Sequence, residues 1–186
     1  MRKIILASNS PRRRELLKKA GIEFEVHPSK YEEVLDNHNF TYEKIENLAF
    51  NKAKYVADEI QENAIIIGAD TVVVLNNTIL TKPIDHDDAI HTLKILSGKE
   101  HQVVTGICII NKYENKTKIK AVTTKVTFEH LSDKMINYYI DNFKPYDKAG
   151  AYGIQELPSG YIKALDGSLE NVIGLCTKTV LSMLND

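Results

Sequence analysis

The sequence predicts an α/β protein with a mixed sheet, and three features support this fold class. Short apolar runs alternate with longer segments whose apolar residues recur every three or four positions. Two of the runs are joined by Asn76-Asn77, which is typical of a hairpin turn. Helices between strands predict parallel pairing and a hairpin adds antiparallel pairing, so we expect both kinds in one sheet. The 186 residues fit one domain, and we expect it to span residues 1–186.

The N-terminal part predicts a strand, a helix and a second strand. Lys3–Ala7 is short and rich in Ile and Leu, as buried strands are. Ser10 is a good N-cap, Pro11 suits the first helical position, and Gly21 is typical of a helix end. Phe24–His27 predicts the second strand.

The middle of the chain predicts a long helix followed by a long apolar strand. Apolar residues mark one face of a helix over about Tyr42–Gln61. Ile65–Ala69 is a continuous apolar run, and Thr71–Leu75 continues it to the hairpin turn. Asp85 or Asp87 can cap the next helix.

Gly98 ends the helix that Asp85 or Asp87 can cap. Further strands are expected at Val103–Ile110, Lys120–Phe128 and Tyr161–Leu165, and further helices at Asp133–Phe143, capped by Ser132, and at about Thr177–Leu184.

The composition excludes several classes of protein. With 43% hydrophobic and 26% charged residues, the chain resembles an ordinary folded protein. Its 24 basic and 25 acidic side chains give a formal net charge of −1, without the basic surplus of nucleic-acid binders. No run approaches the ~20 apolar residues of a membrane span, and the N-terminal run is too short for a signal peptide. We expect a cytoplasmic protein with no membrane or nucleic-acid partner, in which Cys108 and Cys176 are buried free thiols.

The segment from Ser8 to Arg14 carries the strongest local signal. A helix N-terminus presents free N–H groups and partial positive charge, so arginines there are unfavourable by roughly a few tenths of a kcal/mol each. A bound phosphate would reverse that penalty, so we interpret the cluster as an anion site. Arg13 shares the face of Leu16 and Leu17 and should point into a cleft, whereas Arg14 should be solvated. The alternative is a basic surface patch.

Asp70 is the second signal, because a charged residue inside an apolar run is costly to bury unless it is paired or binds metal. Gly68 beside it permits close approach of a backbone or a ligand. The alternative interpretation is that Asp70 lies at the end of a strand and caps a turn. The six histidines show no spacing typical of a zinc site.

Weaker signals come from lysines, an acidic pair and a glycine-rich loop. Lys52 and Lys82 could each be surface residues, as could the pair Glu32-Glu33. The glycines of the loop Gly150–Gly153 can bring backbone amides close to a ligand, and Gln155 could read a base edge because an amide both donates and accepts.

Together these segments resemble the Maf family of nucleoside triphosphate pyrophosphatases, over Leu6 to about Leu175. The motifs, in family order, are LASNSPRRRELL, NLAFNKAK, IIGADTVV, the pair Lys82-Pro83, LSGKEHQVVTG, DKAGAYGIQ and GSLENVIGL. The resemblance implies an elongated sheet flanked by helices, with two lobes around a central nucleotide-binding cleft, and a possible homodimer. It also implies hydrolysis of a nucleoside triphosphate between the α- and β-phosphates, with Mg²⁺ or Mn²⁺.

The resemblance also assigns roles to residues. Asp70 takes the place of the general base and a metal ligand, and Glu33 aligns with a second metal-binding acid. The phosphate-handling set is matched by Ser8, Arg12, Arg13, Lys52 and Lys82. The branch acting on dTTP and UTP is matched at Arg12, Thr71 and Gln155. Two departures are Glu156, where a glycine is common, and Cys176, where a proline is usual.

Three other hypotheses stay open at this point. One is a pyrophosphatase for 7-methyl-GTP or other modified purine nucleotides, and another is a nucleotide-sensing regulator of septum formation. The third is a nucleic-acid binder using Arg12–Arg14 and Lys18–Lys19, which the balanced charge disfavours.

Overall fold

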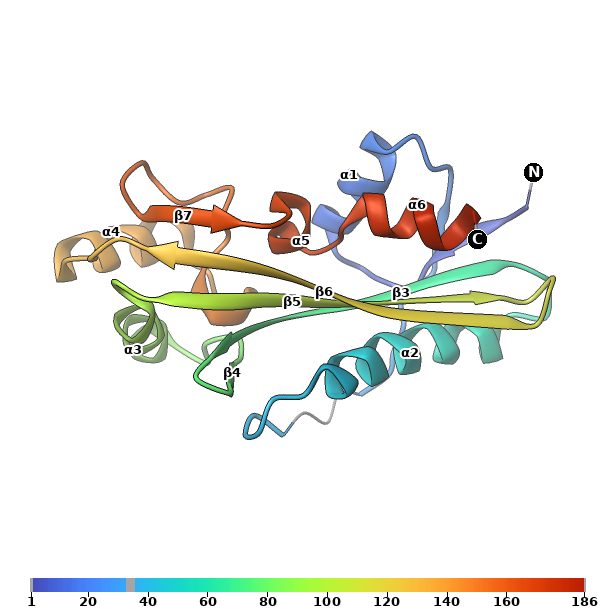
Figure 1. The fold of residues 1–186 in the computed structure, drawn as a ribbon, viewed down its shortest axis with the longest axis horizontal. Helices are drawn as coiled ribbons and strands as arrows, with labels where there is room; N and C mark the ends of the chain where they lie inside the picture. Colours follow the sequence, from blue (N-terminus) through green and yellow to red (C-terminus); the bar gives the residue numbers. More distant parts are fainter. Residues whose placement is uncertain (1, 33–35, 186) are drawn as a thin grey trace.

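The computed structural model describes residues 2–32 and 36–185 of the chain, and within them seven strands form one long sheet (Figure 1). The strand order is β2-β1-β3-β5-β6-β7, and β4 pairs with β3 beside this path. The strands are β1 Ile4–Leu6, β2 Glu25–Val26, β3 Ile65–Leu75, β4 Thr78–Leu80, β5 Glu100–Asn111, β6 Lys116–Phe128 and β7 Ile162–Asp166.

The pairing within the sheet is mixed, as the sequence predicts. β1 is parallel to β2 and to β3, whereas the other pairs are antiparallel. The long strands β3, β5 and β6 run side by side along the longest axis of the molecule (Figure 1). The α/β fold class with an elongated mixed sheet flanked by helices is therefore confirmed.

The helices cover both faces of this sheet. They are α1 Pro11–Lys19, α2 Tyr42–Glu59, α3 His86–Leu96, α4 Asp133–Phe143, α5 Leu169–Ile173 and α6 Thr177–Asn185, with the 3₁₀ turn η1 at Ala149–Ala151. α2 lies on one face, and α1, α5 and α6 lie on the other (Figure 1). α3 and α4 lie together at the end of the sheet where β7 is added (Figure 1).

Two glycines allow α2 to lie against the sheet at close range. A Cβ atom on Gly68 of β3 would lie 2.4 Å from the carbonyl oxygen of Ala49, and one on Gly106 of β5 would lie 2.4 Å from that of Ile45. Such distances are far below van der Waals contact, so only glycine fits at either position. The close approach expected at Gly68 is thus made by the backbone of α2.

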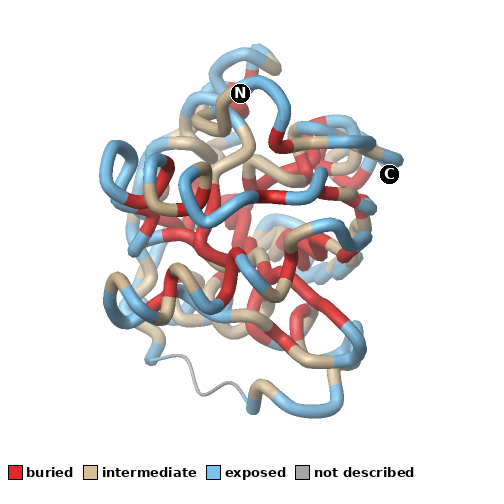
Figure 2. Tube along the Cα trace, turned by 90° about the vertical axis from the view of Figure 1, so that its left-hand side faces the viewer, coloured by how far each residue is buried: buried red, intermediate tan, exposed pale blue. Residues whose placement is uncertain are grey.

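The apolar core lies in separate clusters at the two ends of the sheet. One end packs β1, α1 and α6 around Leu17, Ile67 and Ile107, with α2 on the opposite face. The other end packs α3 and α4 around Leu93 and Tyr139. Figure 2 shows this buried interior as the red segments enclosed by exposed, pale blue ones. The molecule therefore has two lobes connected by the long strands.

The outer edge of β3 is open between the lobes. β1 pairs with Ile65 to Ile67, and β4 pairs with β3 only from Val73 onward. Among the described residues, no strand pairs with that edge between these positions, which include Asp70. This gap positions the site described below.

Most predicted boundaries hold within a few residues, and the differences have physical reasons. Ser10, Asp85 and Ser132 cap their helices as expected, and Asn76 and Asn77 have φ angles of 49° and 66°, as their hairpin turn requires. β5 and β6 are longer than predicted, because their polar end residues continue the antiparallel pairing, as in the pairs Glu100 with Thr127 and Asn111 with Lys116. The five-residue helix α5 is not predicted at all, since one turn leaves no periodicity to detect.

Two further expectations concern the thiols and membrane spans. Cys108 and Cys176 are buried and free, as expected. In the part of the chain that the structure describes, no helix combines the length and the apolar character required to span a membrane.

Candidate active site

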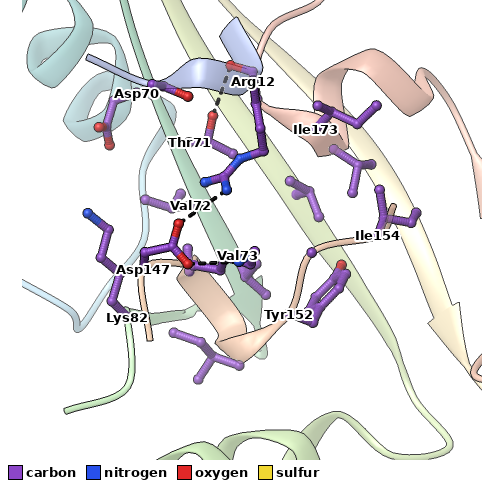
Figure 3. A pocket seen from close by; sticks show the side chains of 18 of the residues that line it. Arg12, Asp70, Thr71, Val72, Val73, Lys82, Asp147, Tyr152, Ile154 and Ile173 are labelled. Carbon is purple, nitrogen blue, oxygen red and sulfur yellow. Dashed lines mark hydrogen bonds and ion pairs between the residues drawn. The ribbon is translucent and has the colours of Figure 1, made fainter. Parts of the chain in front are cut away.

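A cavity of about 480 Å³ lies at the open edge of β3 (Figure 3). Its wall is formed by the start of α1, the middle of β3, the segment after β4, the loop 147–156 and the end of α5. Of the predicted site residues, those that line it are Arg12, Arg13, Lys52, Asp70, Thr71, Lys82 and Gln155. Residues from across the chain are therefore brought together in one place.

Asp70 lies in the wall of the cavity and is paired with a lysine. It is only 7% exposed, and its Oδ1 accepts a hydrogen bond from Nζ of Lys52 on α2. The pairing explains how an aspartate is accommodated inside an apolar strand, since a buried charge needs a partner. Lys82 also lines the cavity, and its side chain points toward the side where Asp70 lies (Figure 3).

Arg13 is held by three oxygen atoms from three segments. Its Nε donates to the carbonyl oxygen of Gly174 at 3.0 Å, and its two terminal nitrogens donate to Oγ of Ser8 at 3.1 Å and to Oγ1 of Thr71 at 3.2 Å. These contacts tie α1 to β3 and to the end of α5. The inward direction predicted for Arg13 is confirmed.

Arg14 lies outside the cavity, but it is half-buried rather than fully solvated. Its terminal nitrogen donates to the side chain of Asn9. Ser8 does not line the cavity, and its hydroxyl instead supports Arg13.

A chain of alternating charges crosses from α1 to the loop 147–156. Arg12 donates to Oδ2 of Asp147 at 3.2 Å, Lys148 donates to Oδ1 of the same residue at 2.8 Å, and Lys148 lies 3.3 Å from Glu156. Burial opposes ionisation of Asp147, but the hydrogen bonds from Lys148 and Arg12 outweigh it and lower the pKa of this carboxyl group. Figure 3 shows Arg12 and Asp147 meeting in the centre of the cavity.

Apolar side chains form the wall away from Asp70. Tyr152, Ile154 and Ile173 lie together there (Figure 3), and we call this group the apolar end of the cavity. Asp70, Lys52 and Lys82 form the charged end. The cavity therefore suits a ligand that is highly charged at one end and flat and largely apolar at the other.

Tyr152 is supported from behind by a buried histidine. Its hydroxyl lies 2.7 Å from Nε2 of His101, which is 2% exposed, and burial lowers the pKa of His101 to about 4. Phe128 packs edge-on against the tyrosine ring at 4.9 Å between centroids. This end of the cavity therefore depends on a neutral histidine.

The structure also brings in residues that sequence reasoning assigned no role. Asp147, Lys148 and Glu156 line the cavity, and the hydroxyl of Thr105 lies 2.9 Å from that of Thr71. Glu156 carries one signal in the sequence, since a glycine is common at this position in the family that the motifs resemble. Glu33 lies outside the described residues, and Glu32 is exposed.

No group of three or more His, Cys, Asp or Glu side chains in residues 2–32 and 36–185 is arranged to hold a metal ion. Asp70, Asp147 and Glu156 are nevertheless carboxylates on the cavity wall.

Comparison with known proteins finds relatives along almost the entire chain. Residues 3–186 match the family described as Maf-like protein. A dTTP/UTP pyrophosphatase of Alkaliphilus oremlandii is 46% identical, and the match covers 94% of this chain and 91% of that protein. A dTTP/UTP pyrophosphatase of Flavobacterium psychrophilum is 44% identical, with coverage of 98% and 94%.

Solved structures show a similar fold at low sequence identity. A HAM1 protein from Coxiella burnetii has a TM-score of 0.52 at 14% identity, and the match covers 100% of this chain and 99% of that one. The Ham1 protein of Staphylococcus aureus has a TM-score of 0.51 at 15% identity, with coverage of 99% and 98%. At such identities the likeness concerns the fold alone.

Proposed function

This chain belongs to the Maf family, and we propose that it is a nucleoside triphosphate pyrophosphatase that hydrolyses dTTP and UTP. The products are the nucleoside monophosphate and pyrophosphate. The observation that carries the proposal is the cavity itself, in which a buried carboxylate and lysines form one end and apolar side chains form the other. The relatives named above favour pyrimidine substrates over the modified-purine alternative.

The triphosphate is proposed to lie across the charged end. Lys52, Lys82, Arg12 and Arg13 all line the cavity, and cations placed in advance stabilise the negative charge of a phosphoryl transition state. Ser8 contributes through Arg13, whose guanidinium it helps to hold. The arginines at the start of α1 then add their charge to the free N–H groups of the helix.

Asp70 is proposed to act as the general base. Its carboxylate would accept a proton from a water molecule as the water oxygen bonds to the α-phosphorus. The bond from that phosphorus to the bridging oxygen breaks, and pyrophosphate leaves with the electron pair. Lys52 holds the carboxylate in position through its hydrogen bond to Oδ1.

A divalent cation, Mg²⁺ or Mn²⁺, is proposed as the cofactor. Magnesium in nucleotide sites usually takes one or two carboxylates and completes its shell with water and phosphate oxygens, so a complete protein cage is not required. Asp70 fits as such a ligand, and Glu33 is proposed as the second from the family resemblance. The cation, when bound, supplies positive charge to the phosphates.

The base is proposed to lie at the apolar end. Tyr152 and Ile154 offer a flat, apolar surface, and Gln155 lines the cavity beside them. Arg12 and Thr71 shape the passage between the two ends. We further propose that residues 1–186 act as one domain, and that a homodimer forms, which sedimentation can test.

The test is a screen for pyrophosphate release from the common and modified nucleoside triphosphates, with Mg²⁺ and with Mn²⁺. We expect dTTP and UTP to give the highest kcat/KM, and no turnover when the metal is chelated. A best activity on 7-methyl-GTP would refute the pyrimidine assignment. Tight nucleotide binding without turnover would instead favour the regulatory alternative.

A further inference from the structure

A lysine and a glutamate stand together on the cavity wall, on the loop that carries Tyr152 and Ile154. Nζ of Lys148 lies 3.3 Å from Oε2 of Glu156, and both residues line the cavity. The lysine side chain is 10% exposed and the glutamate side chain 36%. A hydrogen-bond donor and an acceptor are thus presented side by side.

Neighbouring groups hold this pair in place. The hydroxyl of Tyr139 accepts from the backbone N–H of Gly153 at 2.9 Å and donates to Oε2 of Glu156 at 3.5 Å. The backbone N–H of Glu156 donates to the carbonyl oxygen of Gly153 at 2.9 Å, which closes a tight turn. Asp147 fixes the lysine from its other side at 2.8 Å.

The absence of a side chain at Gly153 makes room for the pair. A Cβ atom there would lie 2.8 Å from Cε of Lys148 and 3.1 Å from Oε2 of Glu156. Both distances are shorter than ordinary contacts, so any larger residue would displace one partner. The turn, Gly153 and Tyr139 therefore fix the positions of Lys148 and Glu156 in the cavity wall.

The pair retains hydrogen-bonding capacity for a ligand. An ammonium group has three N–H donors, and two of them are directed at described residues, Asp147 and Glu156. Both described contacts of the Glu156 carboxylate are made through Oε2. A phosphate would be repelled by this carboxylate, whereas a neutral base edge with an acceptor next to a donor matches the pair.

We propose that Lys148 and Glu156 read the edge of the base, an inference that rests on the proposed function. Uracil and thymine present the O4 carbonyl next to the N3–H group, so Lys148 donates to O4 and Glu156 accepts from N3–H. Cytosine presents an amino donor and a bare N3 acceptor in the same two places, and both contacts are lost. The carboxylate of Glu156 can only accept a hydrogen bond, so it selects a base whose N3 atom carries hydrogen. The amide of Gln155 can rotate to donate or to accept, so it suits either base.

The test compares kcat/KM for UTP and CTP in the wild type and in Glu156→Gln. The amide of the variant can donate to the N3 atom of cytosine. The ratio of kcat/KM for UTP to kcat/KM for CTP should therefore fall at least about tenfold, and kcat/KM for CTP itself should rise. Glu156→Asp keeps an acceptor and should keep the preference. Glu23→Gln, an exposed acid outside the cavity, is the matched control and should leave the ratio unchanged.

The outcomes separate this inference from the proposed function. If the wild type hydrolyses UTP and Glu156→Gln keeps the same ratio, the base-reading role is wrong while the enzyme assignment stands. If the wild type hydrolyses no nucleotide, the proposed function is wrong. The ratio of dissociation constants for UTP and CTP, measured by calorimetry on the same proteins, then decides the base-reading role independently.

Discussion

The charged end of the cavity and its apolar end are assembled in different ways. At the charged end, Asp70 and Lys52 are 18 positions apart, on a strand and on the helix that packs directly against it. At the apolar end, the loop 147–156 reaches α1 through the contact of Asp147 with Arg12, which is 135 positions away. Packing of regular elements positions the first group, whereas side-chain hydrogen bonds position the second.

This difference separates the two tasks of the site. Groups on β3 and α2 cannot shift without moving the sheet, which suits a carboxylate that must meet a phosphorus atom accurately. The loop can change its side chains without disturbing the core, which suits the recognition of different bases. Substitutions at the charged end should therefore lower all activities together, and those at the apolar end should change their ratios.

The largest expected effect is at Asp70. Asp70→Asn keeps the volume of the side chain and removes its charge, so kcat should fall at least ~100-fold for every substrate while the fold is retained. The measurement is kcat for dTTP and UTP, with circular dichroism as the check on folding. Asp87→Asn, at a 98% exposed side chain, is the control. A folded Asp70→Asn protein with near-normal kcat would exclude Asp70 as the base.

The two neighbouring arginines should differ by a smaller factor. Arg13→Ala removes the contacts with Ser8, Thr71 and Gly174, and kcat/KM should fall roughly 30-fold, the scale of a charge-assisted hydrogen bond. Arg14→Ala should change it by no more than about threefold, because that side chain does not line the cavity. Equal losses in the two variants would mean that the cluster acts only as diffuse charge.

The apolar end should show its own pH dependence of stability through His101. Its pKa of about 4 lies below the unfolded value of 6.5, so the unfolded chain binds the proton more readily and acid favours unfolding. Between pH 7.5 and pH 5 this residue should lower the free energy of unfolding by roughly 2 kcal/mol. Urea unfolding at both pH values measures the loss, which should be smaller by that amount in His101→Gln. An identical loss of unfolding free energy in the wild type and in His101→Gln would contradict the lowered pKa of His101.

The smallest expected effect is a change in preference at Gln155. Gln155→Ala should bring the kcat/KM values for dTTP, UTP, CTP, GTP and 7-methyl-GTP closer together by less than about tenfold, because an amide that can both donate and accept contacts the base without fixing the order of donor and acceptor. Hydrolysis itself should persist because the phosphate contacts remain. A uniform slowing of all five substrates would place Gln155 outside base recognition.

The difference between the charged end and the apolar end of the cavity also explains how much of the site could be predicted from the sequence. The cap at Ser10, the inward face of Arg13 and the unusual position of Asp70 are local signals, because helical periodicity and an interrupted apolar run lie within a few residues. The structure confirms where these side chains lie. The partner of Asp70 was not predicted, since a lysine on a helix looks like any surface lysine until the helix is packed.

The loop at the apolar end could not be predicted in the same way. Its glycines suggested a binding loop, but the burial of Lys148 depends on Asp147, Glu156 and Tyr139, which the fold brings together from two elements. The support of Tyr152 by His101 similarly joins residues 51 positions apart. Such contacts leave no periodic pattern in the sequence.

One cavity is proposed to hold a nucleoside triphosphate and to direct water to its α-phosphorus. The most direct measurement is the product analysis of dTTP hydrolysis by the wild-type protein in ¹⁸O-labelled water. We expect equal amounts of dTMP and pyrophosphate, with the label in dTMP. Formation of dTDP and orthophosphate, or a label found in pyrophosphate, would contradict the proposal.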